Sequence, residues 1–183
     1  MRRHFVIDTS AIIPFFFTPT GEEEKAKRAI IKLLKLRDEG KVDLRIPNVC
    51  MAECSKAIAK IVFASSKDHG KCCEQYRKVV NILLDTVSKK RRGLITSLAM
   101  KRKHLEDIED IFIEEYRIPN RGERRLSGVD ALVIAMARDL AKTHGRENVL
   151  IVTKEETMAR VCNQNRDLFS RAIHVLREPI PDA

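Results

Sequence analysis

The stretch FVIDTSAII, Phe5 to Ile13, places an aspartate directly after a short apolar run and follows it with two hydroxyl residues. The apolar run that ends on Asp8 predicts a strand buried on both faces, as strands of parallel sheets are. Ligands of open parallel sheets gather beyond the carboxyl ends of the strands, where Asp8 would lie. The structural alternative is that Asp8 is the N-cap of a helix that begins near Ala11.

The rest of the chain alternates between helical and strand patterns. Apolar residues recur at helical spacing in two segments, Glu22 to Glu39 and Pro47 to Val62. Short apolar runs predict three further strands, at Asp43 to Ile46, Val149 to Thr153 and Ala172 to Leu176. This alternation indicates one domain over residues 1–183, a three-layer α/β/α sandwich with a central parallel sheet.

The middle of the chain differs from both ends, because residues 67–116 show mostly helical pattern and no convincing strand. We therefore expect a helical, basic elaboration at about 65–117. Its segment Thr86 to His104 contains seven Lys or Arg and no carboxylate. One reading is a solvated helix pair, in which Arg102 and Lys103 pair with Glu106 and Asp107 at helical spacing.

The second reading of this segment is an arm that grips nucleic-acid phosphates. Gly93 interrupts the helical pattern between two basic clusters, so the clusters would flank a turn. Three more arginines lie shortly before Asp130 and would extend the same surface. The expected nucleic-acid-binding residues are Lys89, Lys90, Arg91, Arg92, Lys101, Arg102, Lys103, Arg121, Arg124 and Arg125.

Composition is consistent with a soluble globular chain and a polyanionic partner. The 183 residues are 44% hydrophobic and 33% charged, and 35 Lys and Arg against 26 Asp and Glu give a net charge of +9. Such a charge favours nucleic acid through phosphate neutralisation, although an anionic membrane surface or solubility alone would also account for it. No run of apolar residues is long enough to cross a membrane. Five cysteines without CxxC spacing favour a reducing cytoplasm over a disulfide framework.

Three other acidic positions also begin helices or follow strands. Glu53 lies one turn into the second predicted helix, where its structural alternative is an ion pair with Lys56. Asp130 begins the apolar helix of GVDALVIAMA, where a charge needs a reason; a capping box with Ser127 would supply one.

The fourth acid follows the strand Val149 to Thr153. Thr153 could cap the next helix with Glu156 at its third position, which leaves Glu155 without a structural role. Glu155 is therefore the better candidate for a fourth ligand.

Taken together, the order strand-D-T-S, helix with E, GVDALVIAMA and LIVT-x-acid resembles the PIN-domain nuclease family, from Phe5 to about Val161. The resemblance implies that Asp8, Glu53 and Asp130 hold Mg²⁺ or Mn²⁺ and that Ser10 supports the first acid. Glu155 stands at a position that is more often Asp or Asn in the family. The family core also has a third strand where this sequence shows only the basic helical middle.

The chemistry of this residue set agrees with the resemblance. Hard divalent cations prefer oxygen ligands, and clustered carboxylates repel one another without such a cation. A divalent cation near a phosphodiester lowers the pKa of bound water and stabilises the leaving oxygen, so no nucleophilic side chain is required. We therefore expect a metal-dependent endoribonuclease that uses Asp8, Glu53, Asp130 and Glu155.

Alternatives come from other functional classes. A non-catalytic PIN-like RNA-binding or assembly module would keep the fold and the basic surface without efficient metal chemistry. A phosphoaspartyl enzyme would need a second aspartate two residues after Asp8, where the chain has Ser10. RNA as the substrate comes from the resemblance, and so do an antitoxin protein and a second copy of the chain as partners. The sequence does not choose between a toxin and an RNA-processing nuclease.

Overall fold

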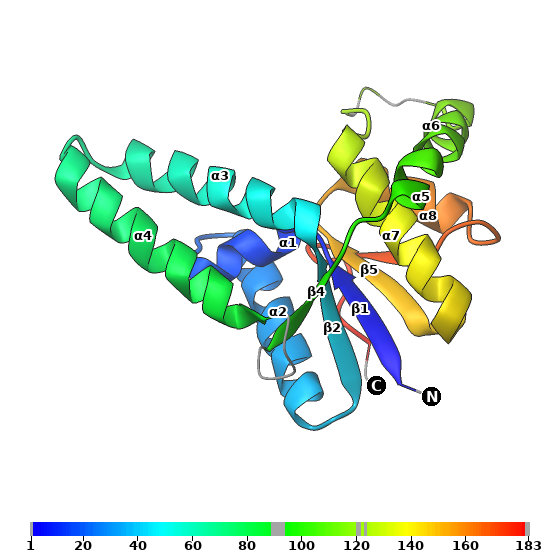
Figure 1. Ribbon diagram of the computed structural model, residues 1–183, viewed down its shortest axis with the longest axis horizontal. Helices are drawn as coiled ribbons and strands as arrows, with labels where there is room; N and C mark the ends of the chain where they lie inside the picture. The colour runs from blue at the N-terminus through cyan, green and yellow to red at the C-terminus, as the bar shows by residue number, and fades with distance from the viewer. Residues whose placement is uncertain (1, 89–93, 120–121, 123, 182–183) are drawn as a thin grey trace.

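The computed structural model describes residues 2–88, 94–119, 122 and 124–181. Its centre is a six-stranded sheet with the strand order β3-β4-β2-β1-β5-β6, and every neighbouring pair is parallel (Figure 1). The strands are β1 (Arg3–Ile7), β2 (Val42–Pro47), β3 (Val87–Ser88), β4 (Ile95–Leu98), β5 (Val149–Thr153) and β6 (Arg171–His174). All six carboxyl ends therefore point to one edge of the sheet.

Strand β1 lies in the middle of the sheet because its residues are apolar on both faces. It pairs with β2 on one side and with β5 on the other, with Phe5 opposite Leu44 and Leu150. Phe5, Val6 and Ile7 have no exposed surface. The strand therefore fixes the position of the residue that follows it, Asp8.

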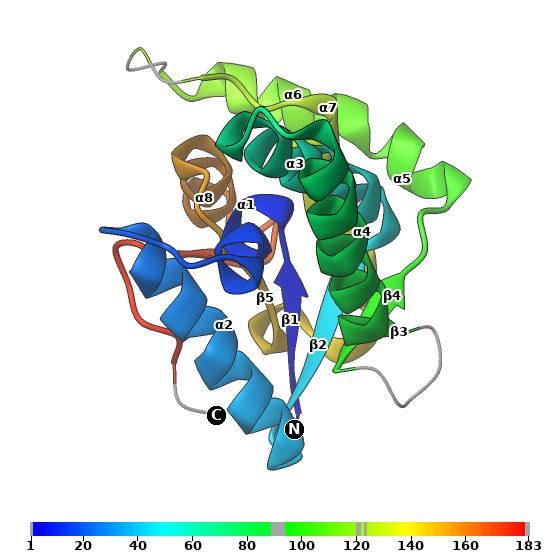
Figure 2. The same ribbon diagram turned by 90° about the vertical axis from the view of Figure 1, so that its left-hand side faces the viewer.

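Helices cover both faces and complete a three-layer α/β/α sandwich. On one side, α2 packs on β2, and α3 and α4 form a helical pair that extends beyond the sheet (Figures 1 and 2). On the other side, α7 packs on β5 and α8 on β6. The helices are α1 (Thr9–Ile12), α2 (Glu23–Asp38), α3 (Asn48–Ser65), α4 (His69–Thr86), α5 (Arg102–Glu106), α6 (Ile108–Arg117), α7 (Gly128–His144) and α8 (Glu156–Gln164), with 3₁₀ turns η1 (Ile13–Phe16) and η2 (Arg146–Asn148).

The expected fold class is confirmed, but the expectation that the mostly helical middle contains no strand is wrong. Residues 65–117 contain β3 and β4 as well as α4, α5 and α6. Strand β4 pairs with β2, with Thr96 opposite Arg45 and Leu98 opposite Pro47. Its last residue is followed closely by Met100, whose N–H donates to Asn48 Oδ1 over 3.0 Å at the start of α3. The basic residues on both sides of this short strand concealed it in the sequence.

Within the described ranges, no helix is long and apolar enough to span a bilayer. All five cysteines are free thiols, and Cys50, Cys54, Cys72 and Cys162 among them are buried.

Candidate metal centre

Asp8 lies at the carboxyl edge of the sheet, between the ends of β1 and β5. Its N–H donates to Val152 O over 2.9 Å, which continues the pairing of the two strands by one residue. Its side chain accepts a hydrogen bond from Ser10 N and is the N-cap of α1. The two readings of Asp8 are compatible, because the residue caps a helix at the same edge where ligands of such sheets bind.

The hydrogen bonds that described residues donate to the Asp8 side chain all go to one carboxylate oxygen. Oδ2 accepts from Ser10 N over 3.2 Å, from Ser10 Oγ over 2.5 Å and from Thr153 Oγ1 over 3.0 Å. None of the described residues donates a hydrogen bond to Oδ1. The network therefore holds the carboxylate in one orientation and leaves Oδ1 available to a cation.

The surroundings of Asp8 disfavour its charge. Burial raises the pKa of Asp8 to about 6, and the nearby carboxylate of Asp130 adds to the effect, while the hydrogen bonds from Ser10 and Thr153 oppose it. An anion that is desolvated and repelled in this way is stabilised by a divalent cation. The donor chemistry at this position therefore fits Mg²⁺ or Mn²⁺.

Glu53 reaches the same place from α3. Thr9 Oγ1, next to Asp8 in the chain, donates to Glu53 Oε2 over 3.0 Å. One ligand atom each from Asp8, Glu53 and Cys50 lie within 4.8 Å of one another. Among the described residues, Glu53 forms no ion pair with Lys56, so its structural alternative is not realised.

Cys50 is a member of this group that sequence reasoning missed. The side chain is fully buried. Burial, followed by repulsion from Asp8, raises the pKa of the Cys50 thiol far above its usual range. A neutral thiol is a poor ligand for hard cations, which take oxygen donors. The carboxylates of Asp8 and Glu53 are therefore the donors in this group that suit Mg²⁺ or Mn²⁺.

Asp130 faces the same cleft from the first turn of α7, but it is not in the group of ligand atoms that lie within 4.8 Å of one another. Ser127 N donates to Asp130 Oδ2 over 2.7 Å, and Asp130 N donates to Ser127 Oγ over 3.1 Å, which is the expected capping box. The residue also lines the same cleft as Asp8 and Glu53 and is close enough to raise the pKa of Asp8. The cap therefore holds Asp130 in place beside the other acids.

Glu155 and Glu156 point to different places. Glu155 is the N-cap residue of α8 without a side-chain capping bond; its N–H donates to Thr153 Oγ1 over 2.9 Å, and it lines the cleft. Glu156 is the first residue of α8 and pairs with Arg177. The expected capping box of Thr153 and Glu156 is wrong, because the helix begins at Glu156 and the Thr153 hydroxyl binds Asp8 and Glu155 instead.

The cleft that these acids share has a volume of about 770 Å³. Of the described residues, four carboxylates and four cations line it, so a divalent cation would make this lining net positive. Of the cations, only Arg124 was expected from the sequence. The lining residues are Asp8, Thr9, Ser10, Ile13, Glu53, Lys56, Ala57, Lys60, Arg124, Ser127, Asp130, Lys154 and Glu155.

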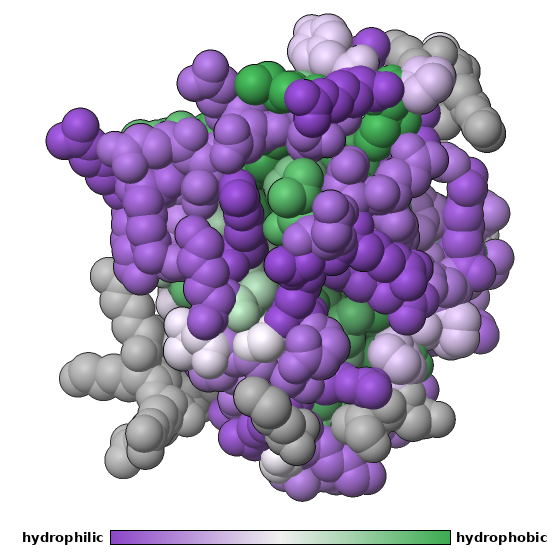
Figure 3. Space-filling model, turned by 90° about the vertical axis from the view of Figure 1, so that its right-hand side faces the viewer, coloured by the Kyte–Doolittle hydropathy of each residue, from purple (hydrophilic) through white to green (hydrophobic). Residues whose placement is uncertain are grey.

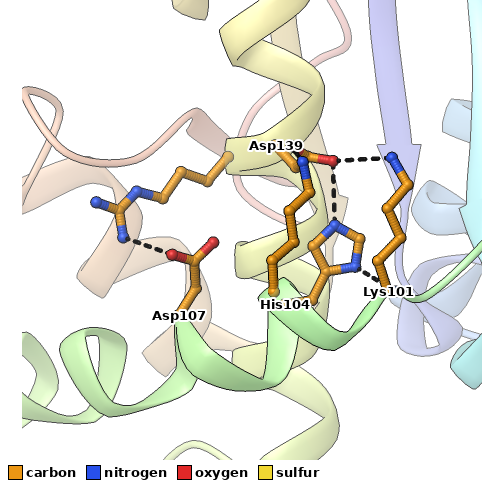
Figure 4. Close-up of polar contacts among 6 residues, drawn as sticks. Lys101, His104, Asp107 and Asp139 are labelled. Atoms are coloured by element: carbon orange, nitrogen blue, oxygen red, sulfur yellow. Dashed lines mark hydrogen bonds and ion pairs between the residues drawn. The ribbon is translucent and has the colours of Figure 1, made fainter.

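The expected basic arm does not line this cleft where the structure describes it. Arg102 pairs with Glu106 over 3.1 Å, as the solvated-helix reading expected. Lys101 and Lys103 both pair with Asp139 of α7, and His104 Nε2 lies 3.2 Å from the same carboxylate (Figure 4).

Lys103 therefore does not pair with Asp107, which lies 3.6 Å from Arg138 instead. The outer face of the α5 to α8 layer is mostly hydrophilic (Figure 3).

Of the remaining expected basic residues, Arg125 lies in the described part of the chain and the others do not. Arg125 lies with its guanidinium 4.6 Å from the centre of the Tyr116 ring and donates to Glu115 O, which ties it to α6. The others, Lys89, Lys90, Arg91, Arg92 and Arg121, lie outside the described residues.

No protein-family model and no curated protein matches the chain. Among solved structures, the chain is similar to the crystal structure of PAE2754 from Pyrobaculum aerophilum, with 16% sequence identity and a TM-score of 0.47. The match covers 88% of this chain and 87% of that chain. Similarity at this level carries no argument about activity, so a functional assignment depends on the residues of the cleft.

Proposed function

We propose that the chain is a metal-dependent endoribonuclease of the PIN-domain type. One observation carries the proposal: Asp8, Glu53, Asp130 and Glu155 come from four distant parts of the chain and line one cleft at the carboxyl edge of a parallel sheet. Asp8 and Asp130 each cap a helix, but among the described residues no structural role requires four carboxylates in one place. The order of these acids, which resembles that of PIN-domain nucleases, supports the same reaction class.

Asp8 and Glu53 would hold Mg²⁺ or Mn²⁺, with Asp130 and Glu155 beside them. When bound, such a cation stabilises charge that develops on a phosphodiester and lowers the pKa of a water molecule for in-line attack. Ser10 and Thr153 orient Asp8 through its Oδ2. Thr9 performs the same task for Glu53.

The cations of the cleft would offset its repulsion of phosphate. Arg124 and Lys154 lie beside the acids, and Lys154 is itself held by Glu23 over 2.8 Å. Cations aimed at a transferring phosphoryl group stabilise its charge. The choice of RNA over DNA rests on the family resemblance, as do an antitoxin and a second copy of the chain as partners. The free, mostly buried cysteines agree with a cytoplasmic location.

The test is incubation of the pure protein with mixed structured and unstructured RNAs in Mn²⁺, Mg²⁺ or EDTA. We expect cleavage in either metal ion and none in EDTA. Asp8→Asn should abolish cleavage, because it removes the ligand charge with little change of shape.

Glu156→Gln is the matched control for this test, since Glu156 pairs with Arg177 outside the cleft. It should cleave like the wild type. RNA binding without cleavage in any metal would contradict the proposal and favour the non-catalytic RNA-binding module. Cleavage that persists in Asp8→Asn would remove Asp8 from the reaction.

A further inference from the structure

One face of α3 continues the cleft away from the acids. Glu53, Lys56, Ala57 and Lys60 all line the cleft, at spacings of three, four and seven residues. Residues at this spacing share one face of a helix. The small side chain of Ala57 leaves the space between the two lysines open. The face therefore presents a carboxylate and then two ammonium groups, in order along α3 from the acids toward the end of the helix that leads to α4.

Within the part of the chain that the structure describes, the two lysines have no structural partner. Both are exposed, and neither forms an ion pair or hydrogen bond with any of the described residues. Lys154, on the same cleft, is by contrast paired with Glu23. Like charges four residues apart on a helix repel each other, so the pair weakens α3 rather than stabilising it.

The spacing along the helix decides which phosphates the lysines can meet. Lys56 lies one turn beyond Glu53, and Lys60 lies two turns beyond it, about 10 Å along the axis at 1.5 Å per residue. A phosphate at the carboxylates is therefore out of reach for Lys60. Lys60 is placed instead to meet a neighbouring phosphate of the same strand.

We propose that α3 guides the nucleic-acid strand: Lys56 and Lys60 bind successive phosphates on one side of the phosphate at the acids, and the strand runs along α3 toward its junction with α4. This inference rests on the proposed function for the position of the reacting phosphate. It replaces the α5 segment as the path, because Lys101 and Lys103 are neutralised by Asp139. The lysines are positioning residues, and they read no base.

The test measures binding of a fluorescent single-stranded RNA by anisotropy over a range of salt concentrations, in EDTA and in Mn²⁺. All proteins carry Asp8→Asn, so that the RNA stays intact. The double variant Lys56→Gln/Lys60→Gln should weaken binding about tenfold at low salt. It should also reduce the magnitude of the negative slope of log K against log salt by about 1.4, at 0.7 per phosphate contact.

The matched control is Lys25→Gln/Lys35→Gln, which removes the same charge from exposed positions of α2. It should leave the slope unchanged. Equal slopes for all three proteins, or an equal loss in the control, would overturn the proposal. Thermal unfolding of each variant shows whether the fold is intact, and a variant that unfolds early is replaced by Lys56→Ala/Lys60→Ala, which removes the same charges with a stronger helix former and should show the same loss of slope.

The two proposals fail separately. If the wild type never cleaves RNA but the Lys56 and Lys60 variant loses slope, the nuclease assignment fails and the binding path stands. If the wild type cleaves and the slopes are equal, the nuclease assignment stands and the path along α3 is wrong.

Discussion

Asp8 is held in an orientation that suits a cation but disfavours its own charge. The pKa of the group rises from 3.8 to about 6 because the side chain is buried and lies near Asp130. A carboxyl group whose pKa is raised in the folded state favours folding only while it is protonated. This contribution to stability is fully present below about pH 4 and is lost as pH rises through about 6. Without metal, ionised Asp8 therefore destabilises the fold near neutral pH.

Asp8→Asn should consequently stabilise the metal-free protein. At pH 7.5 in EDTA we expect the free energy of unfolding to rise by about 2–3 kcal/mol, from a pKa difference of about two units at 1.4 kcal/mol each. The measurement is chemical unfolding followed by circular dichroism. At pH 4 both side chains are neutral, so the difference should disappear. A variant less stable than the wild type at pH 7.5 would show that the Asp8 carboxylate is not strained by burial.

Glu155 and Glu156 are neighbours in the chain with separate roles. Glu155→Gln should weaken Mn²⁺ binding or slow cleavage about tenfold, because it removes one of the four charges on the cleft. Glu156→Gln should change neither, because Glu156 pairs with Arg177. Isothermal titration with Mn²⁺ compares the two variants. The opposite order of effects would place the fourth acid at Glu156.

The acids could be picked out from the sequence because Asp8, Asp130 and Glu155 sit at element boundaries next to a strong apolar pattern and Glu53 lies one turn into such a helix. Thr153 and Cys50 could not, since the position of a hydroxyl or a buried thiol beside Asp8 depends on how β5 and α3 pack. Lys56 looked like the partner of Glu53. The hydroxyl of Thr9 donates a hydrogen bond to Glu53 instead, and this contact joins residues 44 positions apart in the sequence.

At the scale of elements, α5 is docked on α7 through one carboxylate. His104 Nδ1 accepts from Lys101 N over 2.9 Å, so Nε2 carries the proton and donates to Asp139. Partial burial would raise the pKa of Asp139, but hydrogen bonds from Lys103, His104 and Lys101 outweigh it and lower the pKa to about 2. This contribution to stability is present above about pH 4 and is lost as pH falls toward 2.

Asp139→Ala should therefore loosen the segment from β4 to α5. We expect a loss of about 1–3 kcal/mol in local stability, because the buried His104 loses its partner. Hydrogen exchange should become faster in residues 95–106 and stay slow in β1 and β5. Asp110→Ala is the control, since Asp110 lies on α6 and is an exposed partner of Arg138 of α7. Unchanged exchange in residues 95–106 would mean that packing alone holds this segment.

The same segment explains where sequence reasoning failed. Strand β4 has four residues, and only Ile95 among them is buried, so its apolar signal is weak beside the flanking lysines and arginines. Its identity depends on pairing with β2, which is a contact between distant parts of the chain. Strands β1 and β5, by contrast, contain consecutive buried apolar residues and are recognisable from those residues alone.

For the whole molecule, the arrangement of the strands explains why distant acids meet. A sheet in which all strands are parallel brings every strand end, and the helix that follows it, to one edge. The alternation of elements predicted that sandwich, and the sandwich places Asp8, Glu53 and Glu155 on the same cleft. The charge distribution was less predictable, because it depends on which lysines find carboxylate partners after folding.

The central claim is that these carboxylates bind a divalent cation, and anomalous diffraction from crystals grown with Mn²⁺ tests it most directly. We expect an anomalous peak in the cleft at about 2.1 Å from Asp8 Oδ1 and from a carboxylate oxygen of Glu53. The peak should be absent from crystals of Asp8→Asn. A cleft without an anomalous peak at saturating Mn²⁺ would contradict the claim, and so would a peak that persists in Asp8→Asn.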